Sequence, residues 1–473
     1  MHKDFILQKI TSFFPYEPNS EQYLALHTLS GFLSSPDCNQ VLLFKGYAGT
    51  GKTTMLGAAV KMMDMLHRKV ILLAPTGRAA KVFAEYAGHG AFTIHKKIYR
   101  QQKFTAGFSG FSLTANLHAD TVFIVDEASM ISNERSDTSA FGSGCLLDDL
   151  IHYIYSGVNC RLILTGDSAQ LPPVMQAESP ALSAERLKGY GLQVAEIQLT
   201  QVVRQQRASG ILFNATSLRN ALRSGKMDVY PKVTTERFAD VRKIDGLDLI
   251  EELSAAYSRD GVDDTIVICR SNKSANIYNN GIRNRILYRE EELSSGDRLM
   301  VVKNNYYWGV KQQMEVDFIA NGEIMQVLRV RKTEHEAGFR FCNVLVRFDD
   351  HETEIELKIL LDTLHDESPA LSKGANEKLF AAINESYSHI HTKSERMKMI
   401  KDDPYFNAVQ VKYAYAVTCH KAQGGQWSNV FLDIGYVTDD MMGEDFYRWL
   451  YTAFTRATKQ LYLVNWKEAC KTK

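Results

Sequence analysis

The first half of the chain alternates short apolar runs with segments of helical periodicity. Between the first two runs, Leu56, Ala59, Val60 and Met63 recur at the spacing of one helix face. Strand, helix and strand in that order predict a parallel sheet with right-handed crossovers. The runs lack polar alternation, which is typical of strands buried on both faces. They are VLLF (41–44), VILLA (70–74), VFIV (122–125) and RLILT (161–165).

The second half repeats this pattern around a segment of a different kind. Residues 328–404 contain the strand-like stretches FRFCNVLVRF (339–348) and TEIELKIL (353–360), followed by a charged helical stretch. We interpret 328–404 as an insertion, part small β-barrel and part helical, that interrupts a second parallel sheet. The runs assigned to that sheet are TIVIC (265–269), YAYAV (413–417), NVFLDI (429–434) and LYLV (461–464).

Composition narrows the class of protein. The 473 residues are 45% hydrophobic and 23% charged, which is typical of a folded protein and excludes disordered and fibrous chains. Lysine plus arginine and aspartate plus glutamate both number 55, so the net charge is zero. This balance argues against a wholly basic surface but allows a local basic channel.

The use of cysteines and the length of the apolar runs indicate in which cellular compartment the protein is expected. Seven cysteines without a C-x-x-C pair argue against a metal or disulfide framework and favour a reducing, cytoplasmic location. The apolar runs all fall well short of the ~20 residues of a membrane span, so we expect no membrane partner. The segment MHKDFILQKITSFF (1–14) is too polar for a secretory signal, and we expect an amphipathic surface helix there.

A glycine-rich segment, GYAGTGKTT (46–54), joins the first strand to the first helix pattern. It fits G-x-x-x-x-G-K-[ST] in the strand–loop–helix context that a phosphate-binding loop requires. Glycines let backbone N–H groups turn toward phosphate oxygens, and the helix N-terminus adds positive potential. We expect Lys52 to reach the outer phosphates of ATP and the Thr53 hydroxyl to bind Mg²⁺. The predicted nucleotide-binding residues of this loop are Gly46, Ala48, Gly49, Thr50, Gly51, Lys52, Thr53 and Thr54.

Two later strands end in carboxylates. In VFIVDEASM (122–130), Asp126 follows a buried strand and is expected to hold the Mg²⁺ water shell, while Glu127 orients and deprotonates the attacking water. In LTGDSAQLPPV (164–174), Gln170 leaves its strand on a turn and is expected to sense the γ-phosphate through that water. An ordinary turn is the alternative for this second segment.

These motifs together resemble a known family. Residues 20–60 and 120–175, with TCHKAQGGQW (418–427) and YTAFTRATKQLYLV (451–464), resemble superfamily 1 DNA helicases. The closest match is the 5′→3′ branch, superfamily 1B, which includes the RecD-type and phage Dda-type enzymes. The resemblance implies an α/β fold with two RecA-like parallel-sheet domains in tandem, a small hairpin insertion in the first and the barrel-like plus helical insertion in the second. The expected boundaries are 1–96 and 119–220 for the first domain, 97–118 for the hairpin, 221–327 and 405–473 for the second domain, and 328–404 for its insertion.

The resemblance also implies further nucleotide contacts. Gln22 stands where the family reads adenine, and Gly425 belongs to a turn that connects the nucleotide cleft to the DNA contacts. Arg204 in LTQVVRQ (199–205) and Arg456 in TAFTRA match arginines that act on the γ-phosphate, the second one supplied by the other sheet. A surface ion pair is the alternative for either arginine.

Single-stranded DNA contacts are likewise carried over from the family. They lie in APTGRAAK (74–81), FTIHKKIY (92–99), MVVKNNYYWG (300–309) and TCHKAQGGQW. A basic groove with stacked aromatics is the usual way to hold a single strand. The residues expected to contact DNA are Thr76, Arg78, Thr93, His95, Phe104, Phe108, Lys303, Asn304, Thr418, His420 and Lys421.

Two glycine-containing segments predict turns. KFTAGFSGFSLTA (103–115) lies where the family has a hairpin pin that splits the duplex, and Phe104, Phe108 or Phe111 could supply the wedge. A flexible loop that packs its phenylalanines locally explains the segment equally well. Asn321-Gly322 between apolar runs is a hairpin signal.

The hypothesis is therefore an ATP-dependent DNA helicase that translocates 5′→3′ on single-stranded DNA and unwinds duplex or forked DNA. It uses ATP and Mg²⁺, and we expect a monomer that works in replication, repair or recombination, with room for a protein partner. The first alternative is a DNA-motor subunit of a nuclease or recombination complex that does not unwind by itself. The second is a non-motor NTPase switch or an RNA-directed remodeller.

Overall fold

A six-stranded parallel sheet forms the first half of the computed structural model, which describes residues 2–101, 111–135, 141–203, 208–227, 230–312, 318–349 and 354–466. Its strand order is β3-β2-β6-β7-β1-β8. The predicted residues Phe104, Phe108 and Arg204 lie outside the described ranges. The strands are β1 (Gln40–Gly46), β2 (Lys69–Ala74), β3 (Ala91–Thr93), β6 (Thr121–Val125), β7 (Arg161–Gly166) and β8 (Gln193–Leu199).

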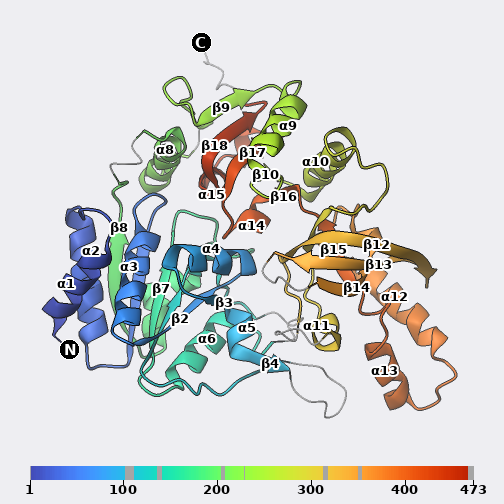
Figure 1. Cartoon of the computed structure of the whole chain (residues 1–473), viewed down its shortest axis with the longest axis horizontal. Helices are drawn as coiled ribbons and strands as arrows, with labels where there is room; N and C mark the ends of the chain where they lie inside the picture. The colour runs from blue at the N-terminus through green and yellow to red at the C-terminus, as the bar shows by residue number, and fades with distance from the viewer. Residues whose placement is uncertain are drawn as a thin grey trace.

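Helices cover both faces of this sheet (Figure 1). Leu42 and Phe44 of β1 pack in one buried cluster with α1, α2 and α3, whereas Val41 and Leu43 pack in another with α5 and α6. An unbroken apolar run is therefore needed, because neighbouring side chains point into different cores. The helices are α1 (Lys3–Phe13), α2 (Ser20–Ser34), α3 (Lys52–Met65), α4 (Gly77–Ala87), α5 (Ile94–Ile98), α6 (Leu146–Tyr155) and α7 (Ala184–Gly189).

A second parallel sheet, β16-β10-β17-β18-β9, forms the other half. The predicted domain boundary at 220 falls inside α8, and Ile211, Ala215 and Leu218 of this helix pack in the second domain's core with α15. The helix α8 therefore packs in the core of the second domain, although most of its residues precede the predicted boundary. The elements are α8 (Gly210–Ser224), β9 (Val241–Ile244), α9 (Leu249–Asp260), β10 (Thr265–Cys269), α10 (Asn272–Arg285), β16 (Ala416–Thr418), α14 (Cys419–Ala422), β17 (Trp427–Asp433), α15 (Glu444–Phe454) and β18 (Ala457–Val464).

A closed five-stranded barrel interrupts the second sheet, as Figure 1 shows at its right side. It is wider than the predicted insertion 328–404, because its first and last strands pair with each other across more than 100 residues of sequence. The predicted run YAYAV is split accordingly: Tyr413 ends a barrel strand and Ala416 begins a sheet strand. The strands are β11 (Arg298–Val301), β12 (Ile324–Glu336), β13 (Phe339–Phe348), β14 (Glu354–Leu360) and β15 (Val409–Tyr413).

The Asn321-Gly322 turn does not make the predicted local hairpin. Gly322 has a positive φ of 92°, as a turn requires, but the strand that follows it, β12, pairs with β11 instead. Between β14 and β15 the chain forms α12 (Lys373–Ser386) and α13 (Lys393–Lys401), which bury a small separate apolar cluster against the barrel. Among the described residues, none of the helices has the length and apolar character to cross a membrane.

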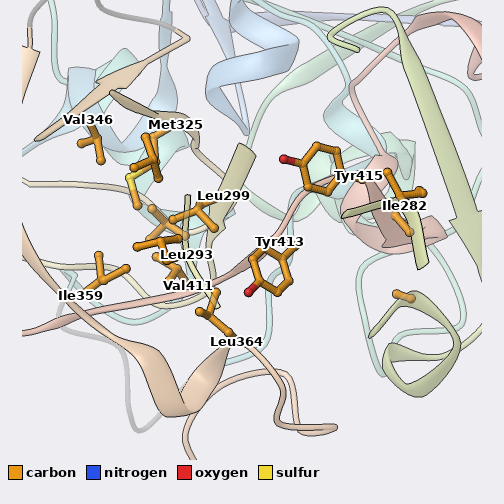
Figure 2. Close-up of a cluster of buried hydrophobic side chains, with 14 of the residues drawn as sticks. Ile282, Leu293, Leu299, Met325, Val346, Ile359, Leu364, Val411, Tyr413 and Tyr415 are labelled. Atoms are coloured by element: carbon orange, nitrogen blue, oxygen red, sulfur yellow. The ribbon is translucent and has the colours of Figure 1, made fainter. Parts of the chain in front are cut away.

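The barrel and the second sheet share one core. Figure 2 shows Leu299, Met325 and Val411 of the barrel in the same cluster as Ile282 of α10. Next to this core, fully buried Asp297 forms ion pairs with Arg283 at 3.0 Å and Arg289 at 2.8 Å, and it accepts a hydrogen bond from the Tyr415 hydroxyl. These contacts hold the barrel firmly on the second domain.

The insertion in the first domain contains a short antiparallel pair, β4 (Tyr99–Gln101) and β5 (Phe111–Leu113). Phe111, one of the three wedge candidates, is buried against Phe141, Tyr306 and Phe318. It therefore joins the base of this hairpin to the segment between β11 and β12 and is not an exposed wedge. A buried ion pair of 2.9 Å between Lys96 of α5 and Glu323 ties the same two regions together.

Candidate nucleotide site and nucleic-acid groove

The phosphate loop lies between β1 and α3, as the sequence predicts. Gly49 and Gly51 have φ values of 72° and 90°, a conformation that strongly favours glycine. The Lys52 ammonium donates to the carbonyls of Gly46 at 2.5 Å and Tyr47 at 3.1 Å. The lysine thus folds over the loop, and a methyl group at Gly46 would lie only 2.8 Å from its side chain.

Gln22 does not present a free amide to a base. Its Nε2 donates to the Thr50 carbonyl at 3.0 Å, and its Oε1 accepts from the Asn19 N–H at 3.1 Å as part of a capping box on α2. Both ends of the side chain are therefore in use, and the residue is 3% exposed. In this conformation Gln22 braces the phosphate loop from behind.

Asp126 and Glu127 follow β6 directly. Burial, and next the charge of Glu127, raise the pKa of Asp126 to about 7, against the opposing effect of Lys52 and Arg456. Glu127 has φ 51°, a left-handed backbone that non-glycine residues adopt at a cost of about 1–3 kcal/mol. This strained turn directs two neighbouring carboxylates toward the phosphate loop.

Asp167 and Gln170 come from the loop after β7. Burial raises the pKa of Asp167, while Lys52 and a hydrogen bond from Tyr451 oppose that shift. The Oε1 atom of Gln170 is buried and has no hydrogen-bond partner within the described part of the chain. A buried amide oxygen without a partner costs about 1–3 kcal/mol, so this position suits a ligand-facing group.

Arg456 reaches the same site from the second domain. Its Nη1 atom lies 3.7 Å from the Glu127 carboxylate and also donates to the Gly425 carbonyl at 3.2 Å. Its Nε donates to the Thr452 carbonyl, and the side chain is 3% exposed. The guanidinium is thus held in the cleft between the two sheets, beside the strand-end carboxylates.

Further contacts join the two halves at this end of the cleft. The Leu171 N–H donates to Thr452 Oγ1, and Gln423 Nε2 donates to the Leu171 carbonyl, both at 2.8 Å. Arg448 of α15 donates to the carbonyl of Ser168 at 2.5 Å. The loop after β7 is therefore held along its length by α14 and α15.

Seven of the predicted DNA contacts line one cavity of about 310 Å³ between the two halves. The cavity runs from the ends of β2 and β3 to α14 and the segment before β12. Lys303 and Thr418 are not among its lining residues, although both flank it in sequence. The seven are Thr76, Arg78, Thr93, His95, Asn304, His420 and Lys421.

Two of the predicted contacts begin helices. The hydroxyls of Thr76 and Thr93 accept from the N–H groups of Ala79 and Lys96, each at 3.2 Å, and so cap α4 and α5. Their hydroxyl hydrogens remain able to donate. His95 packs against aromatic rings, and burial lowers its pKa to about 4, so it acts as a neutral imidazole rather than as a cation.

Arg78 joins the two halves at the middle of the cleft. Its guanidinium lies 3.9 Å from the centre of the Trp427 ring, at the start of β17, and this stack was missing from the sequence prediction. Gly424, with φ 74°, lets the second domain approach so closely that a methyl group there would lie 2.8 Å from Ala79 Cβ. Lys421 donates to Asn321 Oδ1 at 2.5 Å, and burial lowers its pKa to about 8.

A larger cleft of about 1100 Å³ adjoins the cavity and shares Arg78, Thr93 and Gly322 with it. It lies between α4 and α5 on one side and the barrel on the other. Several cations border it, although Lys96, Arg298 and Arg347 are paired with carboxylates. The basic residues of its lining are Arg78, Lys81, Lys96, Lys97, Arg100, Arg298 and Arg347.

Comparison with known proteins agrees with this arrangement of two domains. Residues 19–237 match the AAA domain, and residues 413–464 match the UvrD-like helicase C-terminal domain. The ATP-dependent RecD2 DNA helicase of Deinococcus radiodurans is 25% identical over 94% of this chain and 48% of its own length, so the chain spans about half of that relative. The ATP-dependent DNA helicase dda of enterobacteria phage T4 is 26% identical over 61% of this chain and 62% of its own.

Among solved structures, a Bacteroides Pif1 helicase in complex with ADP-AlF3 and single-stranded DNA superposes with a TM-score of 0.45 at 17% identity, over 93% of this chain and 91% of that one. The two matched domains frame the cleft in which Arg456 meets Glu127. In these two domains the chain is therefore similar to ATP-dependent DNA helicases.

Proposed function

We propose that this protein is a DNA helicase that hydrolyses ATP to move 5′→3′ along single-stranded DNA and to open duplex or forked DNA. One observation carries the proposal: the Arg456 guanidinium, from the second domain, lies 3.7 Å from the Glu127 carboxylate of the first. Hydrolysis that needs groups from both domains depends on the relative position of the domains. Turnover of ATP can therefore be converted into movement.

The first domain supplies the groups for hydrolysis. Lys52 binds the outer phosphates, Glu127 orients and deprotonates the attacking water, and the free amide oxygen of Gln170 contacts that water. Arg456, with Arg204 as the second expected arginine, stabilises the charge of the transition state. The Gln22 amide uses one of its two N–H donors on Thr50, so the second N–H and the oxygen's second lone pair are the groups proposed to read the adenine edge.

The residues present fit Mg²⁺. Thr53 and Asp126 offer the hydroxyl and carboxylate oxygens that this ion prefers. Burial and the charge of Glu127 raise the pKa of Asp126 against the opposing effect of Lys52 and Arg456, so the two neighbouring carboxylates would be stabilised by a further positive charge. Bound Mg²⁺ would supply that charge and neutralise phosphate oxygens.

The DNA strand is proposed to lie across the cavity between the two halves and to continue into the larger cleft beside the barrel. The lining by Arg78, His420 and Lys421 from both domains supports this path. A strand that contacts both halves is gripped differently as the cleft closes and opens. The same path places the β4–β5 insertion and the barrel near the entering duplex, as expected for the pin of the family.

Unwinding of matched DNA substrates tests the proposal. We expect the purified protein to hydrolyse ATP faster with oligo-dT and to unwind duplexes with a 5′ single-stranded tail, but not those with a 3′ tail. Equal ATPase rates with and without DNA would contradict the motor function. Translocation without unwinding would favour the alternative, a motor subunit of a nuclease or recombination complex. Stimulation by RNA but not DNA would favour an RNA-directed remodeller.

Two further features stay proposals. We propose that the protein acts as a monomer in the cytoplasm, and that it serves replication, repair or recombination with a protein partner. Light scattering during ATP-driven unwinding would report the oligomeric state of the active form.

A further inference from the structure

Tyr451 of α15 occupies an unusual position in the cleft. Its hydroxyl accepts a hydrogen bond from the Ala48 N–H of the phosphate loop at 2.9 Å and donates one to Asp167 Oδ2 at 2.6 Å. The side chain is 1% exposed, and burial raises the pKa of the phenol well above its usual value, so it is a neutral donor and acceptor at all working pH values. One atom of the second domain thus links two functional loops of the first.

Both partners of this hydroxyl change their surroundings when nucleotide binds. Backbone N–H groups of a phosphate loop turn toward phosphate oxygens. Ala48 belongs to this loop, and its N–H donates to the Tyr451 hydroxyl. Asp167 is close enough to Lys52 and Glu127 for their charges to influence its pKa, so phosphate and metal charge will act on it as well.

The helix that carries Tyr451 also carries other cross-domain contacts. Arg448 and Thr452 hold the loop after β7, and Arg456, just beyond the helix end, bonds to the Thr452 carbonyl while facing Glu127. A shift of α15 therefore moves the guanidinium. The Tyr451 hydroxyl, in addition, hydrogen-bonds to the phosphate loop itself.

We propose that Tyr451 is a positioning residue that couples nucleotide binding at the phosphate loop to the position of the second domain relative to the first. This inference rests on the proposed function. The Tyr451 hydroxyl holds the Ala48 N–H while phosphate is absent and releases it to a phosphate oxygen when ATP binds. Release frees α15 to carry Arg456 toward the γ-phosphate and changes the width of the DNA cavity. Tyr451 does not itself touch the reacting atoms.

The effect of ATP-analogue binding on the affinity for single-stranded DNA tests this role of Tyr451. Wild-type protein should bind fluorescent oligo-dT with an affinity that a non-hydrolysable ATP analogue changes about 5- to 150-fold, the usual range for coupled sites. Tyr451→Phe keeps the ring and removes the hydroxyl. We expect it to reduce that change to about twofold or less and to tighten analogue binding in the absence of DNA, because no hydroxyl competes for the Ala48 N–H.

Tyr257→Phe is the matched control. Tyr257 lies in α9 of the same domain, and its buried hydroxyl has no hydrogen-bond partner within the described ranges. We expect this variant to keep the wild-type coupling. Hydrogen exchange gives a second reading: the Ala48 amide should exchange faster in Tyr451→Phe without nucleotide, and at the wild-type rate with nucleotide bound.

Three results would overturn the inference. Unchanged coupling in a folded Tyr451→Phe variant is the first, equal loss of coupling in Tyr257→Phe the second, and unchanged exchange at Ala48 the third. In each of these cases wild-type ATPase still responds to DNA, so the proposed function stands. If wild-type ATPase is indifferent to DNA, the proposed function fails, and this inference fails with it.

Discussion

The two ends of the cleft between the domains are built differently. At the nucleotide end, hydrogen bonds donated by Gln423 and Tyr451 and one accepted by Thr452 span the interface, together with the close approach of Arg456 to Glu127. At the DNA end, the domains are separated by a cavity of about 310 Å³ that opens into a cleft of about 1100 Å³. Directional contacts hold one end, and space is left for a ligand at the other.

This difference indicates how each end can respond. Hydrogen bonds are sensitive to displacements of less than 1 Å, so the nucleotide end can distinguish ligand states sharply. Under the proposed function, the DNA end holds a strand without reading its bases, for which charge and stacking are sufficient. The stacked pair of Arg78 and Trp427 lies between the nucleotide end and the DNA end and forms the boundary between them.

The largest effect is expected from Arg456→Ala at the nucleotide end. Loss of an arginine that stabilises transition-state charge lowers kcat by about 10³- to 10⁵-fold. Nucleotide affinity should change far less, since the ground state gains little from this group. ATPase assays with oligo-dT check the rate. Arg448→Ala, on the same helix, is the control and should lose less than about tenfold; equal losses would make Arg456 a structural contact only.

The next largest effect is expected from Arg78→Ala, at the boundary between the nucleotide end and the DNA end. Arg78→Ala removes a cation that lines both openings and should weaken oligo-dT binding by about 1.5–3 kcal/mol, roughly 10- to 100-fold, as for hydrogen bonds to charged groups. Fluorescence anisotropy measures the affinity. Exposed Arg186→Ala removes the same charge elsewhere on the first domain and should leave binding unchanged. Equal affinities of Arg78→Ala and wild type would move the DNA path away from this cavity.

The nucleotide end should also respond to pH. Burial raises the pKa of Asp126 to about 7, so the ionised carboxylate that binds Mg²⁺ falls about tenfold per pH unit below that value. ATPase activity should decline accordingly, and added Mg²⁺ should shift the midpoint to lower pH because metal and proton compete. A rate independent of pH between 5.5 and 7.5 would contradict a direct role of this carboxylate.

The stability of the nucleotide-free protein should change in the opposite direction. The folded pKa of Asp126 lies above its ordinary value of 3.8, so this group favours folding at low pH, and its contribution is lost as pH rises through 7. Asp126→Asn, which resembles the protonated form, should therefore exceed wild type by less at pH 5 than at pH 8, because the loss begins near pH 3.8, where the unfolded carboxyl ionises, and is complete above about pH 7. Denaturant unfolding at both pH values measures the difference.

The smallest effect is expected from Lys421→Gln at the DNA end. Removing one phosphate contact should lower the slope of log affinity against log salt by about 0.7 and weaken binding by a small factor. Because burial lowers the pKa of Lys421 to about 8, wild-type affinity should fall between pH 7 and 9, and that of the variant should stay level. Parallel pH profiles would show that Lys421 faces away from the strand.

The sequence predicted the central strands well, because segments buried on both faces leave continuous apolar runs. TIVIC (265–269) coincides with β10, and VFIV lies within β6. The strands β8 and β9 were missed, since several of their side chains are exposed and no such run results. The barrel boundaries were wrong because β11 and β15 pair over a distance in sequence that no local pattern records.

The candidate site was predictable where its residues are contiguous. The phosphate loop, Asp126 and Glu127 stand in segments whose local order already specifies a turn after a strand. The remaining features depend on long-range packing: Gln22 is bound to the loop, Phe111 is buried, and Tyr451 looks like an ordinary core residue of an amphipathic helix. The sequence identifies such residues, but only the folded structure shows which groups their polar atoms contact.

The junction around Asp297 has a mechanical consequence. Because this carboxylate and its two arginines fix the barrel to the second sheet, any swing of that half carries the whole barrel with it. β12 is 13 residues long and spans about 43 Å, so each degree of rotation about its inner end sweeps its outer end through about 0.7 Å. A small rotation of the second domain at the nucleotide end of the cleft therefore displaces the outer end of β12 over a much larger distance.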